Sequence, residues 1–370
     1  MKKVLIFGMT DNPGGVESFI MNYYRKLNRE KIQFDFLCNN KTVAYEDEIA
    51  SLGGEIFKIC ARSENPSLYK KQMTAFFKEN ASEYCAIWVN VCSLANIDYL
   101  KFAKKFGIKT RIIHSHNTQN MDSFLRGLLH KFNRLFIGKY ATHFFACTTL
   151  AADWFYSKKL QKSPNFKLIF NAIDCEKFAF NSSVREECRK ELGITEKCVF
   201  GNVGRFHSQK NQGFLLDIFK EISEKRQDAV LILCGGGSDE AALYQKTKDL
   251  NLEDKVLFVG VRSDVERLFQ AMDVFILPSL YEGLGIVLIE AQAAGLPTLA
   301  SDKVIPEDAR VTSLLKFIPL DSGAENWANE AIEALKKSER PQTLCEISEK
   351  GYDINTQIAG LENFFETEAI

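Results

Sequence analysis

Short apolar runs alternate along the chain with longer stretches of helical periodicity. The runs that predict strands lie at residues 3–8, 111–117, 199–203, 229–234, 256–261 and 274–277. Helical spacing follows several of them, near residue 17 and at 213–223 and 286–294, and returns at 354–365. Strands that alternate with helices in this way are typical of an α/β protein with parallel sheets.

One strand-to-helix junction is especially rich in glycine. Residues 278–297 read PSLYEGLGIVLIEAQAAGLP and follow a predicted strand. Gly283 and Gly285 let the backbone turn tightly and approach a ligand closely, and a helix is predicted over 286–294. Unpaired amides at the start of such a helix, together with its dipole, favour phosphate binding.

Two carboxylates, Glu282 and Glu290, lie eight positions apart in this stretch. If the helix starts near Glu282, Glu290 lies about two turns inside it, and the two lie near one face roughly 12 Å apart. Carboxylates repel phosphate but accept hydrogen bonds from paired hydroxyls, which suits a nucleotide sugar. The alternative is a surface glutamate on a turn and a second one on an ordinary amphipathic helix.

Two cations, Arg205 and Lys210, follow the strand predicted at 199–203. Arginine offers a rigid fork and lysine a point charge, so together they can neutralise a leaving diphosphate. Cations this close together are most often solvated surface residues. Their place at the carboxyl end of a strand favours ligand binding, because ligands collect there in parallel α/β sheets.

Both stretches resemble motifs of the family 4 retaining glycosyltransferases. Residues 278–297 resemble the donor-sugar signature E-x7-E, with its P-S-x-x-E-G start and A-G-x-P end, and residues 204–210 resemble G-R-x-x-x-x-K. The resemblance implies that Arg205 and Lys210 bind the donor diphosphate. Leu284 stands where the family more often has phenylalanine, a departure that bears on which donor is held.

The resemblance also implies the roles of the two glutamates. Glu282 would hold sugar hydroxyls and Glu290 the ribose. The leaving phosphate would accept the acceptor proton on the same face, while the two cations and the amides near Gly283 stabilise its charge.

The implied architecture is GT-B, an α/β fold of two doubly wound Rossmann-like domains that face each other across a cleft. Residues 168–174 resemble the interdomain segment I-x-N-G-I-D of the family, with Ala172 in place of its glycine. We therefore expect an acceptor-side domain at 1–180, a donor-binding domain at 181–350, and a C-terminal helix at 351–370 that crosses back to the first domain.

Two further segments are expected near the donor. Gly14 and Gly15 belong to a turn that resembles the G-G-V/A-E segment of the family, which in relatives touches the donor phosphate and the acceptor pocket. The turn lacks the full G-x-G-x-x-G pattern of a dinucleotide site. Val261 and Arg262 follow another predicted strand, where relatives border the nucleotide base.

The strand predicted at 111–117 carries two of the five histidines, His114 and His116. Family 4 enzymes place a histidine at this strand end, near the donor sugar and acceptor hydroxyl, and His116 aligns best with it. Alternation along a strand puts both histidines on one side. An active-site wall, a structural role and a His-x-His metal site all stay open, but no third ligand is evident, so no bound metal is predicted.

Composition fits a globular protein large enough for two domains. The chain has 370 residues, 46% of them hydrophobic, and its ten cysteines form no C-x-x-C pair, which is typical of reduced thiols in the cytoplasm. No run approaches the roughly 20 apolar residues of a membrane span, and the N-terminus enters a strand with no secretory signal.

The net charge of −1 hides an asymmetry: the first 170 residues carry a net +11 and the rest −12. Residues 124–140 interleave Arg126, Lys131, Arg134 and Lys139 with leucine, phenylalanine and isoleucine, a pattern typical of a helix on an anionic membrane surface. A core-facing helix with a solvated basic side is the alternative. Nucleic acid is not expected as a partner, because the acidic half would repel it.

We therefore predict a retaining, metal-independent hexosyltransferase without a cofactor, which uses a nucleotide diphosphate sugar, with UDP favoured over GDP. Within the family, the chain looks most like bacterial capsule and exopolysaccharide enzymes, which implies a lipid-linked or other glycan acceptor and a cytoplasmic location, peripheral on the inner face of the membrane. The predicted catalytic residues are His116, Arg205, Lys210 and Glu282. The predicted donor-binding residues are Gly14, Gly15, Val261, Arg262, Gly283, Leu284, Gly285 and Glu290. A nucleotide-sugar epimerase of the same fold and a non-catalytic binding module are the rival functions.

Overall fold

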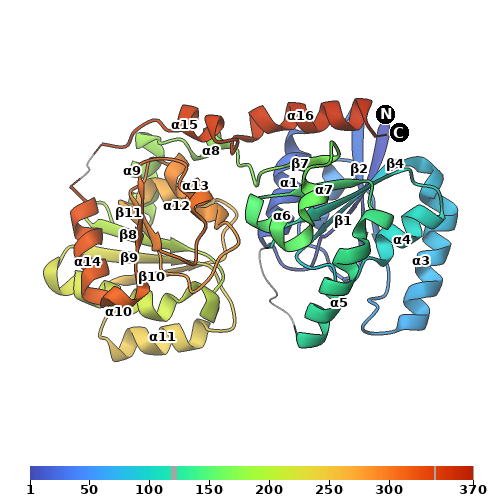
Figure 1. The fold of residues 1–370 in the computed structure, drawn as a ribbon. Coiled ribbons are helices and arrows are strands. Elements are labelled where there is room, and N and C mark those ends of the chain that lie inside the picture. The colour runs from blue at the N-terminus through green and yellow to red at the C-terminus, as the bar shows by residue number, and fades with distance from the viewer. Residues whose placement is uncertain (118–122, 337–338, 370) are drawn as a thin grey trace. The chain divides into compact units, whose positions relative to one another are not determined.

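The computed structural model describes residues 1–117, 123–336 and 339–369. The chain forms two compact units (Figure 1). Unit 1 comprises Met1–Ala172 together with Ile354–Ile370, and unit 2 comprises Ile173–Asp353. Among the described residues, no helix is both long enough and apolar enough to cross a membrane.

Unit 1 contains a seven-stranded parallel sheet in the order β3-β2-β1-β4-β5-β6-β7. Its strands are β1 (Lys2–Phe7), β2 (Ile32–Cys38), β3 (Ile56–Lys58), β4 (Tyr84–Val91), β5 (Thr110–Ser115), β6 (His143–Ala146) and β7 (Phe166–Leu168). The strand order reverses between the neighbours β1 and β4. A sheet with this reversal forms a crevice between the loops that leave the carboxyl ends of those two strands.

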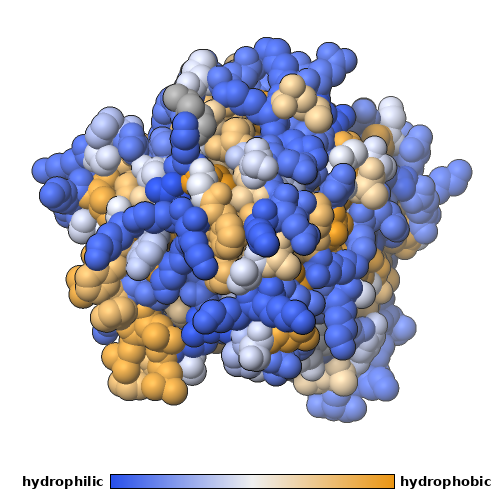
Figure 2. Space-filling model, turned by 90° about the vertical axis from the view of Figure 1, so that its right-hand side faces the viewer, coloured by the Kyte–Doolittle hydropathy of each residue, from blue (hydrophilic) through white to orange (hydrophobic). Residues whose placement is uncertain are grey.

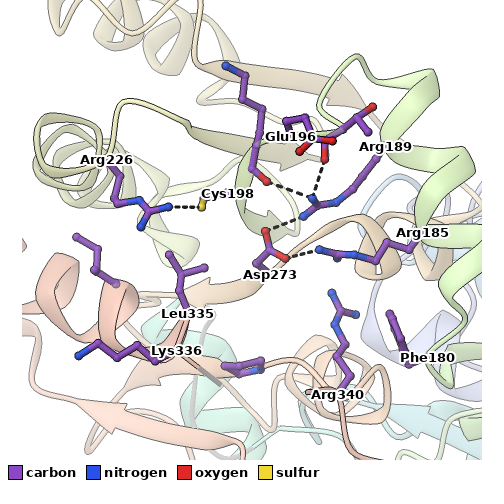
Figure 3. A pocket seen from close by; sticks show the side chains of 14 residues that line it. Phe180, Arg185, Arg189, Glu196, Cys198, Arg226, Asp273, Leu335, Lys336 and Arg340 are labelled. Atoms are coloured by element: carbon purple, nitrogen blue, oxygen red, sulfur yellow. Dashed lines mark hydrogen bonds and ion pairs between the residues drawn. The ribbon is translucent and has the colours of Figure 1, made fainter. Parts of the chain in front are cut away.

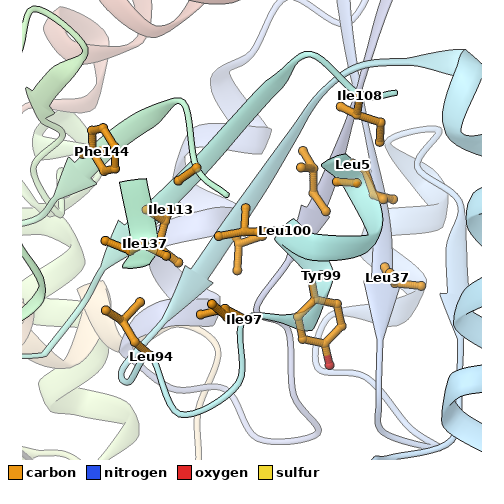
Figure 4. Packing of buried hydrophobic residues seen from close by; sticks show 14 of the residues in the cluster. Leu5, Leu37, Leu94, Ile97, Tyr99, Leu100, Ile108, Ile113, Ile137 and Phe144 are labelled. Carbon is orange, nitrogen blue, oxygen red and sulfur yellow. The ribbon is translucent and has the colours of Figure 1, made fainter. Parts of the chain in front are cut away.

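Helices cover both faces of this sheet. They are α1 (Gly15–Lys26), α2 (Glu46–Ser51), α3 (Pro66–Asn80), α4 (Asp98–Lys105), α5 (Phe124–Phe136), α6 (Thr149–Phe155), α7 (Lys158–Gln161) and α16 (Ile354–Thr367). Successive residues of β1 alternate between two hydrophobic clusters, because side chains in a strand point to opposite faces. Figure 4 shows Leu5, Leu100 and Ile113 meeting in one of them. Val4 and Ile6 belong to the other cluster.

The last helix, α16, belongs to unit 1 although it lies at the end of the chain. It packs against α1 and β2. Phe365 is fully buried, with its ring 5.9 Å from those of Phe34 and Trp88. Burying an aromatic ring of this size contributes about 2 kcal/mol, so α16 completes the core of the unit in which the chain begins.

Unit 2 contains a six-stranded parallel sheet in the order β10-β9-β8-β11-β12-β13. Its strands are β8 (Cys198–Val203), β9 (Ala229–Cys234), β10 (Val256–Gly260), β11 (Val274–Leu277), β12 (Thr298–Ser301) and β13 (Leu315–Ile318). Its helices are α8 (Cys175–Phe178), α9 (Ser182–Glu191), α10 (Gln212–Lys225), α11 (Glu240–Asp249), α12 (Val265–Ala271), α13 (Ile286–Ala293), α14 (Gly323–Ala334) and α15 (Leu344–Glu349). Here the order reverses between β8 and β11.

The predicted α/β class with two doubly wound Rossmann-like sheets is confirmed. The division between units differs from the predicted boundaries near residues 180 and 350. Ile173 donates its backbone N–H to the carbonyl of Tyr352 at 2.9 Å and forms a parallel bridge with Asp353. The segment by which the chain enters unit 2 and the segment by which it leaves pair with each other at this point. Residues 173–180 and their helix α8 therefore belong to unit 2.

Candidate functional site at the carboxyl ends of the strands

The reversal of strand order in unit 2 brings the predicted site residues together. Arg205 and Lys210 lie in the loop that leaves β8, and Glu282 lies in the loop that leaves β11. Because β8 and β11 are neighbours in the sheet, the two loops leave the same edge side by side. This is the position at which doubly wound sheets bind ligands.

Hydrogen bonds tie these two loops to each other. The side chain of Gln209 donates to the carbonyl of Tyr281 at 3.0 Å, and the backbone N–H of Leu280 donates to the carbonyl of Gln209 at 2.8 Å. Asn211 donates from its side chain to the carbonyl of Pro278 at 3.1 Å. Asn211 has a φ of 56°, in the left-handed region that asparagine tolerates better than most residues. The two loops therefore form one cross-linked platform.

The predicted cation and the first predicted carboxylate contact each other directly. Lys210 Nζ lies 2.6 Å from Glu282 Oε1, and the same oxygen accepts a hydrogen bond of 2.7 Å from the hydroxyl of Ser279. Glu282 is only 9% exposed, so its charge needs this pairing. In this structure the charge of Lys210 is directed at Glu282.

Arg205 is exposed at the same strand end. Of the residues that the structure describes, none pairs a carboxylate with its guanidinium. Its backbone carbonyl accepts a hydrogen bond of 3.1 Å from the side chain of Gln212, which begins α10. The loop thus holds the backbone of Arg205 in place while the guanidinium is available to an anion.

The loops after β9 and β10 lie next to this platform. A Cβ on Gly235, which follows β9, would lie 2.0 Å from the carbonyl oxygen of Gly204, so only glycine permits this approach. Val261 is 75% exposed, and Arg262 forms two hydrogen bonds of 2.8 and 2.6 Å with the carboxylate of Asp264. That pairing lowers the pKa of Asp264 and directs the Arg262 side chain along its own loop.

The helix predicted over 286–294 is confirmed as α13, whereas the start near Glu282 from which the position of Glu290 was inferred is wrong. Gly285 has a φ of +75° and is the residue before α13, which begins at Ile286. A residue in the left-handed conformation cannot continue a right-handed helix, so Glu290 lies about one turn inside α13. The spacing of about 12 Å between Glu282 and Glu290 assumed a helix that starts at Glu282, and it therefore does not apply. Gly283 lies half-buried in this turn, and the Leu284 side chain is buried at 3% exposure.

Glu290 has an unusual electrostatic environment for a carboxylate. Burial raises its pKa to about 7, an effect that Lys177 opposes and the negative charge of Glu266 reinforces. Near neutral pH this carboxyl therefore exchanges between its protonated and ionised forms. A titrating carboxyl one turn inside a helix that starts at the platform is a candidate ligand-binding group.

In unit 1, the glycine turn after β1 is organised by a buried glutamate. The carboxylate of Glu17 accepts hydrogen bonds from the backbone N–H and hydroxyl of Thr10, at 3.2 and 2.6 Å, and from the N–H of Gly14 at 3.1 Å. Helix α1 begins at Gly15, two residues before the predicted start near Glu17. Gly14 and Gly15 therefore lie at the carboxyl end of β1, beside the reversal point of the unit 1 sheet.

His116 follows β5 and hydrogen-bonds to Asn90 at the end of β4, with Nε2 3.0 Å from Oδ1. The side-chain nitrogen of Asn90 contacts the carbonyl of Trp88, which assigns the oxygen of the amide to His116. His116 therefore donates from Nε2, and its Nδ1 is an acceptor. Burial lowers the pKa of His116 to about 3, so the ring is neutral.

His114 and His116 lie on the same side, as alternation predicted. Their ring centroids are 4.1 Å apart, and His114 is fully buried and stacks on Trp88. Within the described residues, no group of three or more His, Cys, Asp or Glu side chains is arranged to hold a metal ion.

The basic segment at residues 124–140 contains α5, and the apolar side of this helix does not face the core, unlike in the core-facing alternative. Only Gly127 and His130 are buried in this helix. The large apolar residues point outward and form an apolar face that consists of Phe124, Leu125, Leu128, Leu129, Phe132, Leu135 and Phe136. Of the four basic residues, Arg126, Lys131 and Lys139 are exposed, whereas Arg134 donates hydrogen bonds of 2.9 Å to the carbonyls of Asp153 and Tyr156.

A separate cavity of about 570 Å³ lies at the opposite, amino end of the unit 2 strands (Figure 3). Arg185 and Arg189 pair with Asp273 in its wall, at 2.5 and 2.6 Å. Arg340 donates to the carbonyls of Phe269 and Ala294, near the ends of α12 and α13, and burial lowers its pKa to about 9. Cations at helix C-termini satisfy unpaired carbonyls, so these arginines have a structural explanation.

Sequence reasoning missed the residues that support the site. Ser279, Gln209 and Asn90 each orient a predicted residue or its loop, through partners that are distant in the sequence or hidden by the fold. Asn211 alone had a local signal, since asparagine is enriched in left-handed conformations.

Comparisons with known proteins complete the description of the site. Residues 184–351 match the family described as glycosyl transferases group 1. The "Putative glycosyltransferase EpsF" of Bacillus subtilis is 33% identical over 376 aligned positions that cover 98% of this chain and 96% of the relative. The "UDP-Gal:alpha-D-GlcNAc-diphosphoundecaprenol alpha-1,3-galactosyltransferase" of Escherichia coli is 36% identical over 150 positions, 39% of each chain.

Several solved structures match nearly the whole chain, among them those of Anabaena HepE and WaaG. Anabaena HepE, in complex with UDP and glucose, has a TM-score of 0.79 at 18% identity and covers 99% of this chain and all of its own. WaaG, a glycosyltransferase involved in lipopolysaccharide biosynthesis, has a TM-score of 0.70 at 17% identity and covers 98% of this chain and all of its own. At these identities the likeness shows the fold, which is GT-B.

The pair of Lys210 and Glu282 leads to a first prediction about stability. Lys210→Met leaves a buried carboxylate without its cation, so we expect the free energy of unfolding to fall by about 2 kcal/mol. The double variant Lys210→Met/Glu282→Gln removes both charges. It should therefore be about 1–2 kcal/mol more stable than the sum of the two single changes implies. Urea unfolding of the four proteins measures this coupling.

Lys316→Met is a matched control for that cycle. It breaks the ion pair with Glu330, in which Lys316 is 58% exposed, and should cost less than about 1 kcal/mol. Strictly additive losses in the double variant would show that Lys210 and Glu282 are not coupled in solution.

Proposed function

The chain belongs to the group 1 glycosyl transferases, and from this premise we propose that it moves a hexose from a nucleoside diphosphate sugar to an acceptor hydroxyl with retention of anomeric configuration. The observation that carries the proposal is the platform in unit 2. Lys210 contacts Glu282 there at the reversal of strand order, beside the start of α13, and Arg205 lies exposed on the same loop as Lys210.

The ion pair suggests how the platform responds to the donor. An incoming diphosphate offers Lys210 a doubly charged partner and competes with Glu282 for its ammonium group. Glu282 then becomes an acceptor for the hydroxyls of the donor sugar. Pairing with Lys210 compensates the charge of the buried Glu282 carboxylate, and the two residues exchange partners when the donor binds.

In the proposed reaction, the bond between the anomeric carbon and the leaving phosphate oxygen breaks while the acceptor oxygen bonds to that carbon on the same face. The acceptor proton passes to the leaving phosphate. Arg205 and Lys210 stabilise the negative charge that develops on the diphosphate, together with backbone amides near Gly283. His116 is neutral, and its Nδ1 is buried without a hydrogen-bond partner among the described residues, so a contact with a substrate hydroxyl requires this nitrogen to become accessible when substrate binds.

We propose UDP as the nucleotide in preference to GDP, and a lipid-linked oligosaccharide of exopolysaccharide or capsule synthesis as the acceptor. Support comes from the UDP named for Anabaena HepE and the diphosphoundecaprenol acceptor named for the Escherichia coli relative. Such an acceptor would place the enzyme at the inner face of the cytoplasmic membrane. Neither a cofactor nor a metal ion is part of the proposed chemistry.

The direct test incubates the protein with a panel of nucleotide sugars and lipid-linked acceptors and identifies the products. A glycosylated acceptor that retains the anomeric configuration of the donor, by NMR, supports the proposal. Conversion of the donor sugar into its epimer without any acceptor would replace the proposal by an epimerase.

Removing the guanidinium of Arg205 should affect catalysis and spare folding. Because Arg205 is exposed and its side chain has no ion pair in the described structure, Arg205→Ala should leave the melting temperature unchanged. Loss of a preorganised charge at the leaving group should lower turnover on the order of 100-fold. Release of UDP measures turnover, and Arg310→Ala, which also removes an arginine of unit 2, is the control. Turnover close to wild type would exclude Arg205 from the mechanism.

The two glutamates should respond differently to ligand and to pH. Glu290→Gln should weaken binding of free UDP, whereas Glu282→Gln should spare UDP and weaken the intact donor. An ionised Glu290 accepts hydrogen bonds from both ribose hydroxyls, and its pKa is raised to about 7. The affinity of the wild type for UDP should therefore rise several-fold from about pH 6 to about pH 8, as the carboxyl loses its proton.

Glu290→Gln is also the control for the pH dependence of UDP binding, because this variant lacks the carboxyl of Glu290 while UDP itself still titrates. Isothermal titration calorimetry at both pH values measures the difference between the two proteins. The same pH dependence in wild type and Glu290→Gln would remove Glu290 from the nucleotide site.

Activity should also be independent of divalent metal. In the proposed reaction, Arg205, Lys210 and helix amides neutralise the charge of the leaving diphosphate, a role that a metal ion fills in other enzymes. We expect full turnover in excess EDTA. Loss of turnover that Mg²⁺ or Mn²⁺ restores would contradict the proposed chemistry.

A further inference from the structure

Helix α5 in unit 1 turns its apolar face to solvent and its polar face to the protein, the reverse of the usual arrangement. In most helices of a globular protein the apolar side packs inward and the polar side meets water. In α5 the apolar face points outward, with Phe124 78% and Leu135 78% exposed at its two ends and Phe132 60% exposed between them. Figure 2 shows hydrophobic side chains gathered in a protruding patch at the lower left of the surface, where α5 lies.

The apolar side chains of α5 form one uninterrupted stripe along the helix. At about 100° per residue, its seven side chains fall within one arc of about 140°. Lys131 lies about 20° beyond one edge of this arc, and Arg126 lies about 60° beyond the other. Apolar residues scattered singly on a surface need no explanation, but a contiguous patch rimmed by charge marks an interaction site.

The inner face of α5 is held to unit 1 by hydrogen bonds and by the ring of His130, which stacks on Trp154 with centroids 4.1 Å apart. His130 accepts from the backbone N–H of Leu94 at 3.0 Å, and its other ring nitrogen lies 3.1 Å from the carbonyl of Trp154. Asn133 donates to the carbonyl of Leu94 at 2.7 Å. These bonds fix the rotation of the helix, so the outward direction of the apolar face is set by the fold.

Charge identifies the occupant of this face. Lys131 and Lys139 are exposed beside it, and the first 170 residues carry a net charge of +11. An apolar arc bordered by basic side chains matches the interface of an anionic bilayer, where acyl chains lie below negative headgroups. A partner helix from a protein would need only the apolar arc.

We propose that α5 is a membrane-inserting helix whose apolar face enters the acyl boundary of an anionic bilayer while its basic side chains contact the lipid headgroups. The inference deepens the proposed function, because it gives the enzyme a route to a lipid-linked acceptor, and it rests on that function for the identity of the acceptor alone. Binding to the bilayer requires neither donor nor acceptor.

Insertion differs measurably from attraction by charge alone. Electrostatic binding is lost as salt screens the headgroups. An inserted apolar face keeps part of its affinity at high salt, because burial of apolar surface does not depend on ionic strength. Lys131→Gln/Lys139→Gln should therefore lower the preference for anionic lipid and leave residual binding, whereas removal of the apolar face should abolish binding.

The experiment is cosedimentation of the full chain with vesicles of phosphatidylcholine and phosphatidylglycerol in equal amounts. The test variant is Phe124→Gln/Leu128→Gln/Phe132→Gln/Leu135→Gln, and it should bind at least tenfold more weakly than wild type. The control, Leu68→Gln/Leu344→Gln, changes two apolar residues of 40% and 38% exposure on other helices and should bind like wild type. Melting temperature and the thermal shift caused by UDP are measured on the same samples.

A fluorescent reporter tests insertion directly. Phe132→Trp places an indole in the middle of the apolar face, and lipids brominated on their acyl chains should quench its emission. Leu68→Trp is the control and should not be quenched. Quenching of Phe132→Trp alone supports insertion, and equal quenching or none in both variants overturns it.

The remaining outcomes are decisive as well. Undiminished vesicle binding by the quadruple variant overturns the proposal. A wild-type dimer that the variant converts to a monomer would assign the face to a second copy of the chain, and a melting temperature lowered by several degrees would assign it to contacts within the chain. Failure of vesicle binding with a normal UDP shift leaves the proposed function standing, whereas a missing UDP shift with normal vesicle binding removes the proposed function alone.

Discussion

The candidate site depends on one topological constraint, the reversal of strand order between β8 and β11. Each parallel strand is followed by a loop on the same edge of the sheet, and helices on opposite faces separate the loops at the reversal. The chain places Lys210 on one of these loops and Glu282 on the other, and their ion pair of 2.6 Å closes the platform. Without the reversal, the covering helices would crowd the strand ends and the two residues could not meet over an open crevice.

Local patterns predicted the elements that carry the site, because each of those elements is specified locally. The strands at 229–234 and 274–277 were predicted to the residue, since fully buried strands read as short apolar runs that end at glycine or proline. The helix predicted over 286–294 is confirmed as Ile286–Ala293, whereas the start near Glu282 that was used to place Glu290 is four residues too early. A glycine in the sequence shows that a positive φ is permitted, but the sign of φ at Gly285 is decided by the packing around it.

Contacts between distant residues were beyond reach of the same reasoning. Lys210 and Glu282 are 72 residues apart, and each was assigned its own ligand, so their mutual pairing had no local signal. The unit boundary shows the same limit. Ile173 belongs to unit 2 because it pairs with Tyr352 and Asp353, which return from the far end of the unit. Motif spacing identifies the candidate residues, while the three-dimensional pairing decides which charges are available to a ligand.

Helix α5 shows why amphipathic periodicity alone cannot orient a helix. The sequence defines an apolar and a polar side, and the usual expectation turns the apolar side inward. In this fold the polar side satisfies buried groups: His130 and Asn133 bond to Leu94, and Arg134 caps the end of α6 through the carbonyls of Asp153 and Tyr156. Turning the helix over would bury its apolar face at the cost of leaving those polar groups unpaired, about 1–3 kcal/mol for each one. Unit 1 therefore holds α5 by its polar side, and the apolar side is left for a partner outside the core.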